Sequence, residues 1–88
     1  MCRNITALRG LEPPATDEEI VAAALQYVRK VAGLSSISAT TRPAVDAAVA
    51  EIAATTERLL AALPDRRVPP KKEPPLRRLA VAAARSEL

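Results

Sequence analysis

Prolines decide where this chain of 88 residues can be helical. A proline inside a helix removes a backbone hydrogen bond and clashes with the preceding turn, so helices carry prolines only in their first turn and end before them. The eight prolines leave two long stretches free, one between Pro14 and Pro43 and one between Pro43 and Pro64, and five of the eight lie in residues 64–88. The sequence therefore predicts two helices followed by a proline-rich arm.

The first helix is predicted over residues 17–32 because both of its ends carry recognisable signals. Thr16 and Glu19 have the spacing of a capping box, and the acidic residues 17–19 place negative charge at the positive end of the helix dipole. Gly33 can end the helix in the left-handed conformation. Apolar side chains recur at helical spacing at Ile20, Ala24, either Tyr27 or Val28, and Val31. We interpret the acidic residues as a solvated first turn and not as a metal site.

The second helix is predicted over residues 43–63, with Thr40 or Thr41 as its cap and Pro43 in its first turn. Along it, side chains separated alternately by four and three residues form a seam like that of a coiled coil. The seam consists of Val45, Val49, Ile52, Thr56, Leu59 and Leu63, and Ala48, Ala53 and Leu60 widen it. It can pack against the first helix, but the second helix is longer than the first. We therefore expect part of the seam to bind a second chain, either in a homo-oligomer or on a larger protein.

The residue types favour an all-α fold with a thin core. Hydrophobic residues make up 49% of the chain, but it has no Phe or Trp and only one Tyr. Small aliphatic side chains each remove little area from water and suit the narrow gap between close helices. We expect a helical domain over residues 1–63, in which the N-terminal segment packs on a helical hairpin. A proline-rich basic linker over 64–75 and a short helix over 76–88 should follow.

Positive charge is concentrated in the C-terminal arm. Residues 64–88 contain seven basic and three acidic residues, whereas the first 63 contain six basic and seven acidic ones. The basic residues of the arm are Arg66, Arg67, Lys71, Lys72, Arg77, Arg78 and Arg85. They could contact an acidic protein surface, with Leu76 and Leu79 adding apolar contacts, or pair with the acidic start of the first helix. They could also follow a nucleic-acid backbone without reading its sequence. Because the arm has no aromatic residue for base stacking, we favour a protein partner.

The absence of histidine argues against an enzyme. Without imidazole the chain has no Ser-His-Asp triad, Cys-His dyad or His-ligated metal site, and its two glycines are too far apart for a phosphate-binding loop. We predict no catalytic residue, metal, cofactor or small-molecule substrate. The single cysteine excludes an intramolecular disulfide, and no apolar run is long enough for a membrane span or a signal peptide. These features predict a cytoplasmic protein.

The N-terminus holds the only cysteine, Cys2. If the initiator methionine is removed, the amine and thiol of Cys2 could form a reactive or metal-chelating pair beside Arg3 and Asn4. No second cysteine or histidine can assist that chemistry, so we favour a small buried hydrophobic residue. Arg3 and Asn4 could also belong to a polar patch with side chains of the first helix, although the spacing does not require it. The further members of that patch would be Gln26, Tyr27 and Arg29.

Three stretches of the sequence resemble a known family. The segments MCRNI, EPPATDEEI and AALQYVRKVAG are similar to a family of small bacterial proteins of unknown function whose members begin Met-Cys-Arg-Asn-Ile. The resemblance covers residues 1–33 closely and 43–63 by pattern. It implies a bacterial, cytoplasmic and mostly helical protein, and it transfers no activity. Because Cys2, Arg3 and Asn4 lie in the segment that defines the family, the resemblance gives more weight to a functional N-terminus.

Overall fold

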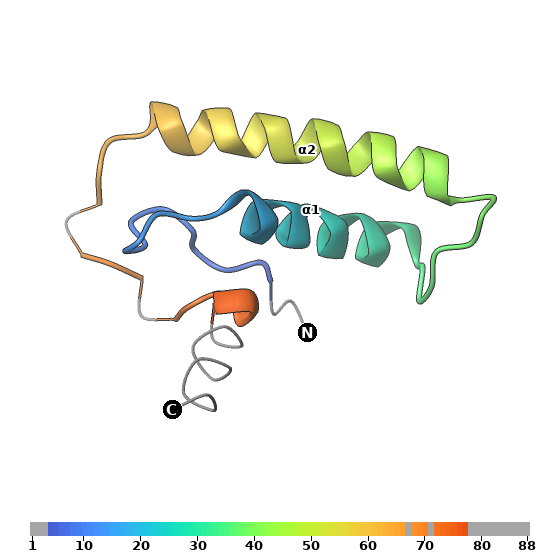
Figure 1. The fold of residues 1–88 in the computed structure, drawn as a ribbon, viewed down its shortest axis with the longest axis horizontal. Coiled ribbons are helices and arrows are strands. Elements are labelled where there is room, and N and C mark those ends of the chain that lie inside the picture. Colours follow the sequence, from blue (N-terminus) through green and yellow to red (C-terminus); the bar gives the residue numbers. More distant parts are fainter. Residues whose placement is uncertain (1–3, 67, 71, 78–88) are drawn as a thin grey trace, which may run out of the picture.

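Two antiparallel α-helices form the body of the molecule (Figure 1). The structure is a computed structural model that describes residues 4–66, 68–70 and 72–77. Helix α1 spans Asp17–Ala32 and helix α2 spans Arg42–Ala62. No strand occurs in the described ranges, and none of the helices described is long and apolar enough to cross a membrane. The predicted all-α fold with a small helical hairpin is therefore confirmed.

Helix α1 occupies the predicted range because the capping box at its start and the glycine at its end both form as expected. The Thr16 hydroxyl accepts a hydrogen bond from the Glu19 N–H at 3.2 Å, and Glu19 Oε1 accepts one from the Thr16 N–H at 2.8 Å. This reciprocal capping box satisfies two donors that the first turn would otherwise leave open. At the other end Gly33 has φ 68°, and the N–H of Leu34 bonds the carbonyl oxygen of Arg29 at 2.9 Å. The left-handed glycine thus turns the chain back over the last helical turn.

Helix α2 begins and ends one residue earlier than predicted, and its first turn is weakly capped. Thr41 is the N-cap residue, but its hydroxyl makes no hydrogen bond to the helix and instead accepts one from the Ser38 N–H at 3.0 Å. Pro43 lies in the first turn, where its missing N–H leaves no intrahelical bond unmade. The helix ends before Pro64, as expected.

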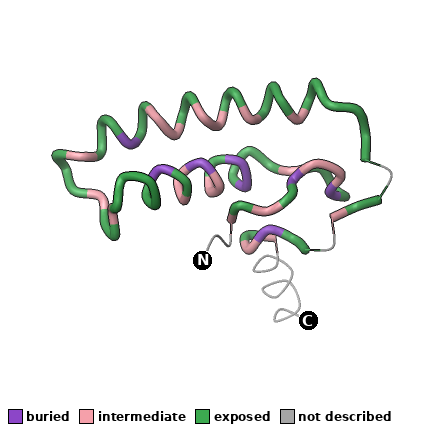
Figure 2. The backbone as a smooth tube through the Cα atoms, turned by 180° about the vertical axis from the view of Figure 1, so that it is seen from behind, coloured by how far each residue is buried: buried purple, intermediate pink, exposed green. Residues whose placement is uncertain are grey.

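The buried side chains lie mainly in α1 and the N-terminal segment, while α2 has one buried residue, a row of half-buried residues on one face, and exposed residues elsewhere (Figure 2). Leu8 and Leu11 of the N-terminal segment pack with Ile20 of α1, and Ala53 and Leu60 of α2 cover this cluster. The buried hydrophobic residues of the described chain are Leu8, Leu11, Ile20, Ala24, Val28 and Val45. The thin core expected from small aliphatic residues is therefore what forms.

The face of α2 that contacts α1 departs from the predicted seam toward its C-terminal end. Val45 is 4% exposed, but Leu59 is 53% and Leu63 38% exposed, and Leu60 takes the inward place beside Leu59. A seam repeating every 3.5 residues drifts by about 20° per heptad around a helix of 3.6 residues per turn. The later members of the seam therefore rotate away from α1.

The chain after α2 passes beside the N-terminal segment and places a helical turn close to the N-terminal end of α1 (Figure 1). Residues 75–77 are helical, one residue earlier than the predicted start of the C-terminal helix, and residues 78–88 lie outside the described ranges. Pro74 is fully buried. The N–H of Arg77 bonds the carbonyl oxygen of Pro74 at 3.1 Å, which closes the turn.

Candidate functional site

Three hollows on the described part of the molecule differ in charge. We call them the apolar groove, of about 260 Å³, the basic hollow, of about 410 Å³, and the end cavity, of about 570 Å³. Pockets of about 300–1,000 Å³ are the usual size for small-molecule sites, and the groove lies just below this range. Each hollow is defined below by its lining residues.

The apolar groove has walls from three parts of the chain. Its lining residues are Ile5, Thr6, Leu8, Ile20, Ala23, Ala24, Tyr27, Ile52, Thr56 and Leu60. None of these is charged at neutral pH. The Thr56 hydroxyl donates to the carbonyl oxygen of Ile52 at 2.7 Å, so α2 satisfies it internally. The groove therefore offers mainly apolar contact from its described lining residues.

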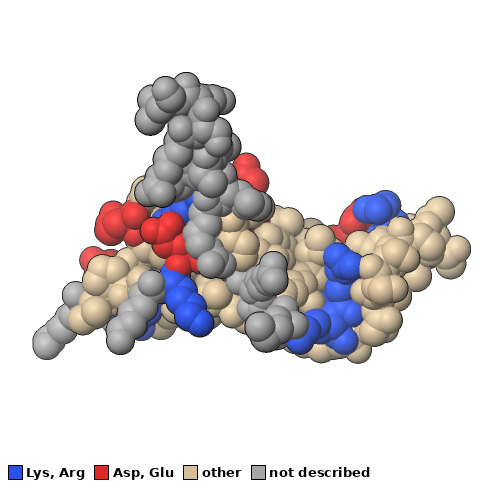
Figure 3. All heavy atoms as spheres, turned by 90° about the horizontal axis from the view of Figure 1, so that it is seen from below, with Lys and Arg blue, Asp and Glu red and all other residues tan. Residues whose placement is uncertain are grey.

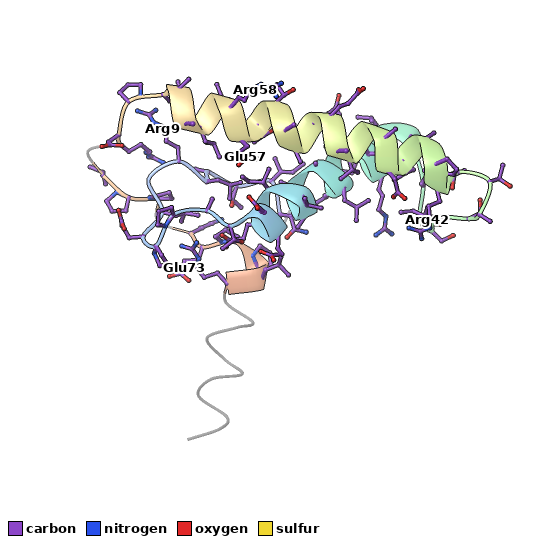
Figure 4. The ribbon with its side chains drawn as sticks, turned by 45° about the horizontal axis from the view of Figure 1, so that its top comes forward. Arg9, Arg42, Glu57, Arg58 and Glu73 are labelled. Atoms are coloured by element: carbon purple, nitrogen blue, oxygen red, sulfur yellow. The ribbon has the colours of Figure 1, made fainter. Side chains whose placement is uncertain are left out.

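The end cavity lies where the N-terminal segment meets the C-terminal end of α2, near Arg9 and Glu57 (Figure 4). Arg9 Nε donates to the carbonyl oxygen of Pro64 at 2.8 Å. Gly10, with φ 90°, lies so close to Arg66 that an added Cβ would be 3.0 Å from the Cβ of Arg66. The charged lining residues are Arg9, Arg66, Glu12, Asp17, Glu57 and Asp65. Within residues 4–66, 68–70 and 72–77, no group of three potential ligand side chains could hold a metal ion.

The basic hollow lies along α1. Asn4, which precedes this helix in the sequence, and Leu34, which follows it, complete the lining. Its lining residues are Asn4, Ala22, Leu25, Gln26, Arg29, Lys30 and Leu34. The backbone N–H of Asn4 donates to Gln26 Oε1 at 2.7 Å, which holds the N-terminal segment against the helix. Three members of the polar patch considered from the sequence, Asn4, Gln26 and Arg29, thus line one hollow, while Tyr27 lines the apolar groove.

A buried ion pair attaches the C-terminal segment to the start of α1. Arg77 Nη2 lies 2.9 Å from Glu19 Oε1 and also donates to the carbonyl oxygen of Pro14 at 3.1 Å. The side chains of Arg77 and Glu19 are 12% and 3% exposed. The other carboxylate oxygen of Glu19 is buried and has no hydrogen-bond partner. We call this pair the clasp, because it joins residues 58 positions apart.

The structure separates the residues that were predicted to bind a partner. Val45 is buried within the hairpin, and Val49 is half-buried in α2. Ile52 lines the apolar groove, whereas Leu63 lines the end cavity. Leu59 and Leu76 are exposed at 53% and 40%, and Leu79 lies outside the described residues.

The basic residues of the arm are also divided. Arg66 and Lys72 are exposed. Arg77 is held within the chain by the clasp, which is the pairing with the acidic start of the first helix that the sequence left open. The remaining predicted contacts, Arg67, Lys71, Arg78 and Arg85, lie outside the described residues, as do Cys2 and Arg3 of the proposed N-terminal site.

Sequence reasoning missed the contribution of the N-terminal segment to the apolar groove. Ile5 and Leu8 are apolar, which was the only available signal, because no periodic pattern in residues 1–16 predicts which face of the hairpin they cover. The only sequence signal for the basic hollow was that Gln26 and Arg29, three residues apart, lie on one face of the predicted helix.

The chain was compared with known families, curated proteins and solved structures. No curated protein and no solved structure matches it significantly. The model of one family, described as "Uncharacterized conserved protein (DUF2277)", matches residues 1–84. Because this match covers nearly the whole chain, the chain belongs to the DUF2277 family of uncharacterized conserved proteins.

Proposed function

We propose that this protein is a non-catalytic interaction protein whose copies associate through the apolar groove. The observation that carries the proposal is the groove itself, which is lined by three segments of the chain and, in the part that the structure describes, by no charged side chain. Association through a groove between helices buries apolar surface without desolvating a charge.

Exposed apolar side chains extend the groove along both helices. Ile5 and Tyr27, which line it, are 44% and 50% exposed. Val31 lies one helical turn beyond Tyr27 and is 67% exposed, and Leu59 lies two turns beyond Ile52. Contiguous apolar surface of this kind is typical of an interaction site.

The charges of the three hollows favour a second copy of the chain as the occupant. In a twofold dimer the same surface of each copy is in contact, so a surface with net charge would face like charge and be repelled. Among the described lining residues, the end cavity has four acidic and two basic ones, and the basic hollow has two basic and no acidic ones. Only the uncharged groove, among the three hollows, meets itself without repulsion. Two hairpins joined in this way would form a four-helix arrangement, which encloses helix faces that one hairpin leaves open.

The test compares two substitutions of exposed apolar residues by sedimentation velocity. Leu59→Lys places a charge on the face of α2 that carries the groove residue Ile52, two helical turns away. Val21→Lys alters an α1 residue that is 42% exposed and projects about 100° around the helix from the groove residue Ile20; neither Leu59 nor Val21 lines the groove itself. The unchanged chain and the Val21 variant should sediment as dimers. The dissociation constant of the Leu59 variant's dimer should be at least about tenfold higher than that of the unchanged chain, and its helical content should be unchanged.

A monomer at every concentration would overturn self-association and leave a helix from another protein as the occupant. Equal weakening by both substitutions would place the contact elsewhere. Sequence-blind nucleic-acid binding, a thiol or metal site at Cys2 and a cytoplasmic location stay predictions from the sequence. No contact described above favours any of them.

A further inference from the structure

The basic hollow has the composition of a small-molecule site. Its volume of about 410 Å³ lies within the usual range for such sites. Ala22, Leu25 and Leu34 give it an apolar lining, and Arg29 and Lys30 are the only charged residues among its described lining residues. Because both charges are positive, the hollow favours an anion that also carries an apolar group.

The two basic side chains differ in how far the protein already uses them. Arg29 Nε donates to the carbonyl oxygen of Leu34 at 3.4 Å, and Arg29 Nη2 donates to that of Ser35. A guanidinium has five N–H donors, so these two bonds position Arg29 without exhausting it. Lys30 is exposed and makes no hydrogen bond or ion pair with any residue that the structure describes. Lys30 can therefore turn toward a ligand at little cost.

The surroundings of the hollow keep the charge positive. Blue atoms gather at the end of the molecule where α1 ends and α2 begins, while most of the red atoms on the same face lie toward the opposite end (Figure 3). The acidic residues of α1 are confined to its first turn and the basic ones to its last turn. The C-terminal end of α1 carries partial negative charge, which disfavours an anion. The Leu34 N–H donates to the carbonyl oxygen of Arg29, so one of the carbonyl groups that carry this charge is already hydrogen-bonded.

We propose that the basic hollow binds a small organic carboxylate, with the carboxylate on Lys30 and Arg29 and the apolar part on Leu25 and Leu34. A guanidinium matches the planar geometry of a carboxylate, and charge-assisted hydrogen bonds are about twice as strong as neutral ones. The apolar lining distinguishes this ligand class from inorganic phosphate, which has nothing to place on the leucines. The site shares no lining residue with the apolar groove, so it stands independently of the association proposed above.

The test is an NMR titration of the full chain with hexanoate, with hexanamide and acetate as matched ligands. Hexanoate should shift the backbone amides of Leu25, Gln26 and Leu34 and saturate. Hexanamide lacks the charge and acetate lacks the chain, so both should bind at least about tenfold more weakly. Binding of hexanamide as tight as that of hexanoate would overturn the proposal.

Two variants locate the site. Lys30→Gln should weaken hexanoate binding about tenfold, because it removes one charge-assisted contact. Arg58→Gln removes a positive charge from the outer face of α2, away from the hollow, and should leave the affinity unchanged (Figure 4). Equal affinity of both variants, or shifts confined to another part of the molecule, would contradict the assignment.

Discussion

Glu19 takes part both in starting α1 and in attaching the C-terminal segment. Its Oε1 accepts hydrogen bonds from the Thr16 N–H and from Arg77, and its side chain is 3% exposed. A buried carboxylate is costly unless it is paired and hydrogen-bonded, and here the capping box and the clasp share one oxygen atom. Glu19 therefore holds residues 74–77 against the N-terminal end of α1.

Removing Arg77 should destabilise the fold more than removing an exposed cation of the same arm. Arg77→Met leaves Glu19 buried without its ion-pair partner, which should lower the free energy of unfolding by about 3 kcal/mol. Lys72→Met changes an exposed residue and should cost no more than about 0.5 kcal/mol. Urea denaturation followed by helical circular dichroism measures both. Equal effects would show that the clasp contributes nothing to stability.

The two helices differ at the level of the element in how their N-terminal ends are stabilised. α1 has a complete capping box and three acidic residues in its first turn. α2 has neither a side-chain cap nor an acidic residue in its first turn, and it begins with the basic Arg42. Because the N-terminal end of a helix carries partial positive charge, α2 lacks a stabilising interaction that α1 has.

A negative charge in the first turn of α2 should therefore stabilise the protein. Ala44 is exposed, so Ala44→Glu should raise the free energy of unfolding by about 0.5 kcal/mol and the melting temperature by about 3 °C at low salt. Ala44→Lys is the matched control and should lower both. Thermal unfolding followed by circular dichroism checks the pair. Shifts of the same sign would contradict the dipole argument.

The helices could be predicted from the sequence because their end signals are local. Thr16, Glu19 and Gly33 fixed α1 at both ends, and the prolines limited α2 to within one residue. The face that α2 buries was predicted less well, because a repeat of 3.5 residues and a helix of 3.6 diverge over 21 residues. Leu59 was placed in the middle of the seam and Leu60 at its edge, whereas Leu60 packs on the core cluster and Leu59 is 53% exposed.

The three hollows arise only in the whole molecule, because each combines segments that are far apart in the sequence. The groove needs Ile5 beside Tyr27 and Ile52, and the clasp needs Arg77 beside Glu19. No local pattern encodes these distances, so the sequence predicted a helix surface for binding but not its N-terminal wall. The composition did predict that the core would be thin. Within the described chain, the small aliphatic residues form a core of only six buried hydrophobic side chains.

The most direct test of association through the apolar groove is an NMR experiment on a mixture of ¹³C-labelled and unlabelled chain. Tyr27 is the only aromatic residue, so nuclear Overhauser effects from its ring are assigned without ambiguity. The proposal predicts effects between the Tyr27 ring of one copy and the methyl groups of Ile52 or Leu59 of another. Ring contacts found only within one copy, or contacts between copies confined to Leu63 and Leu76, would contradict it.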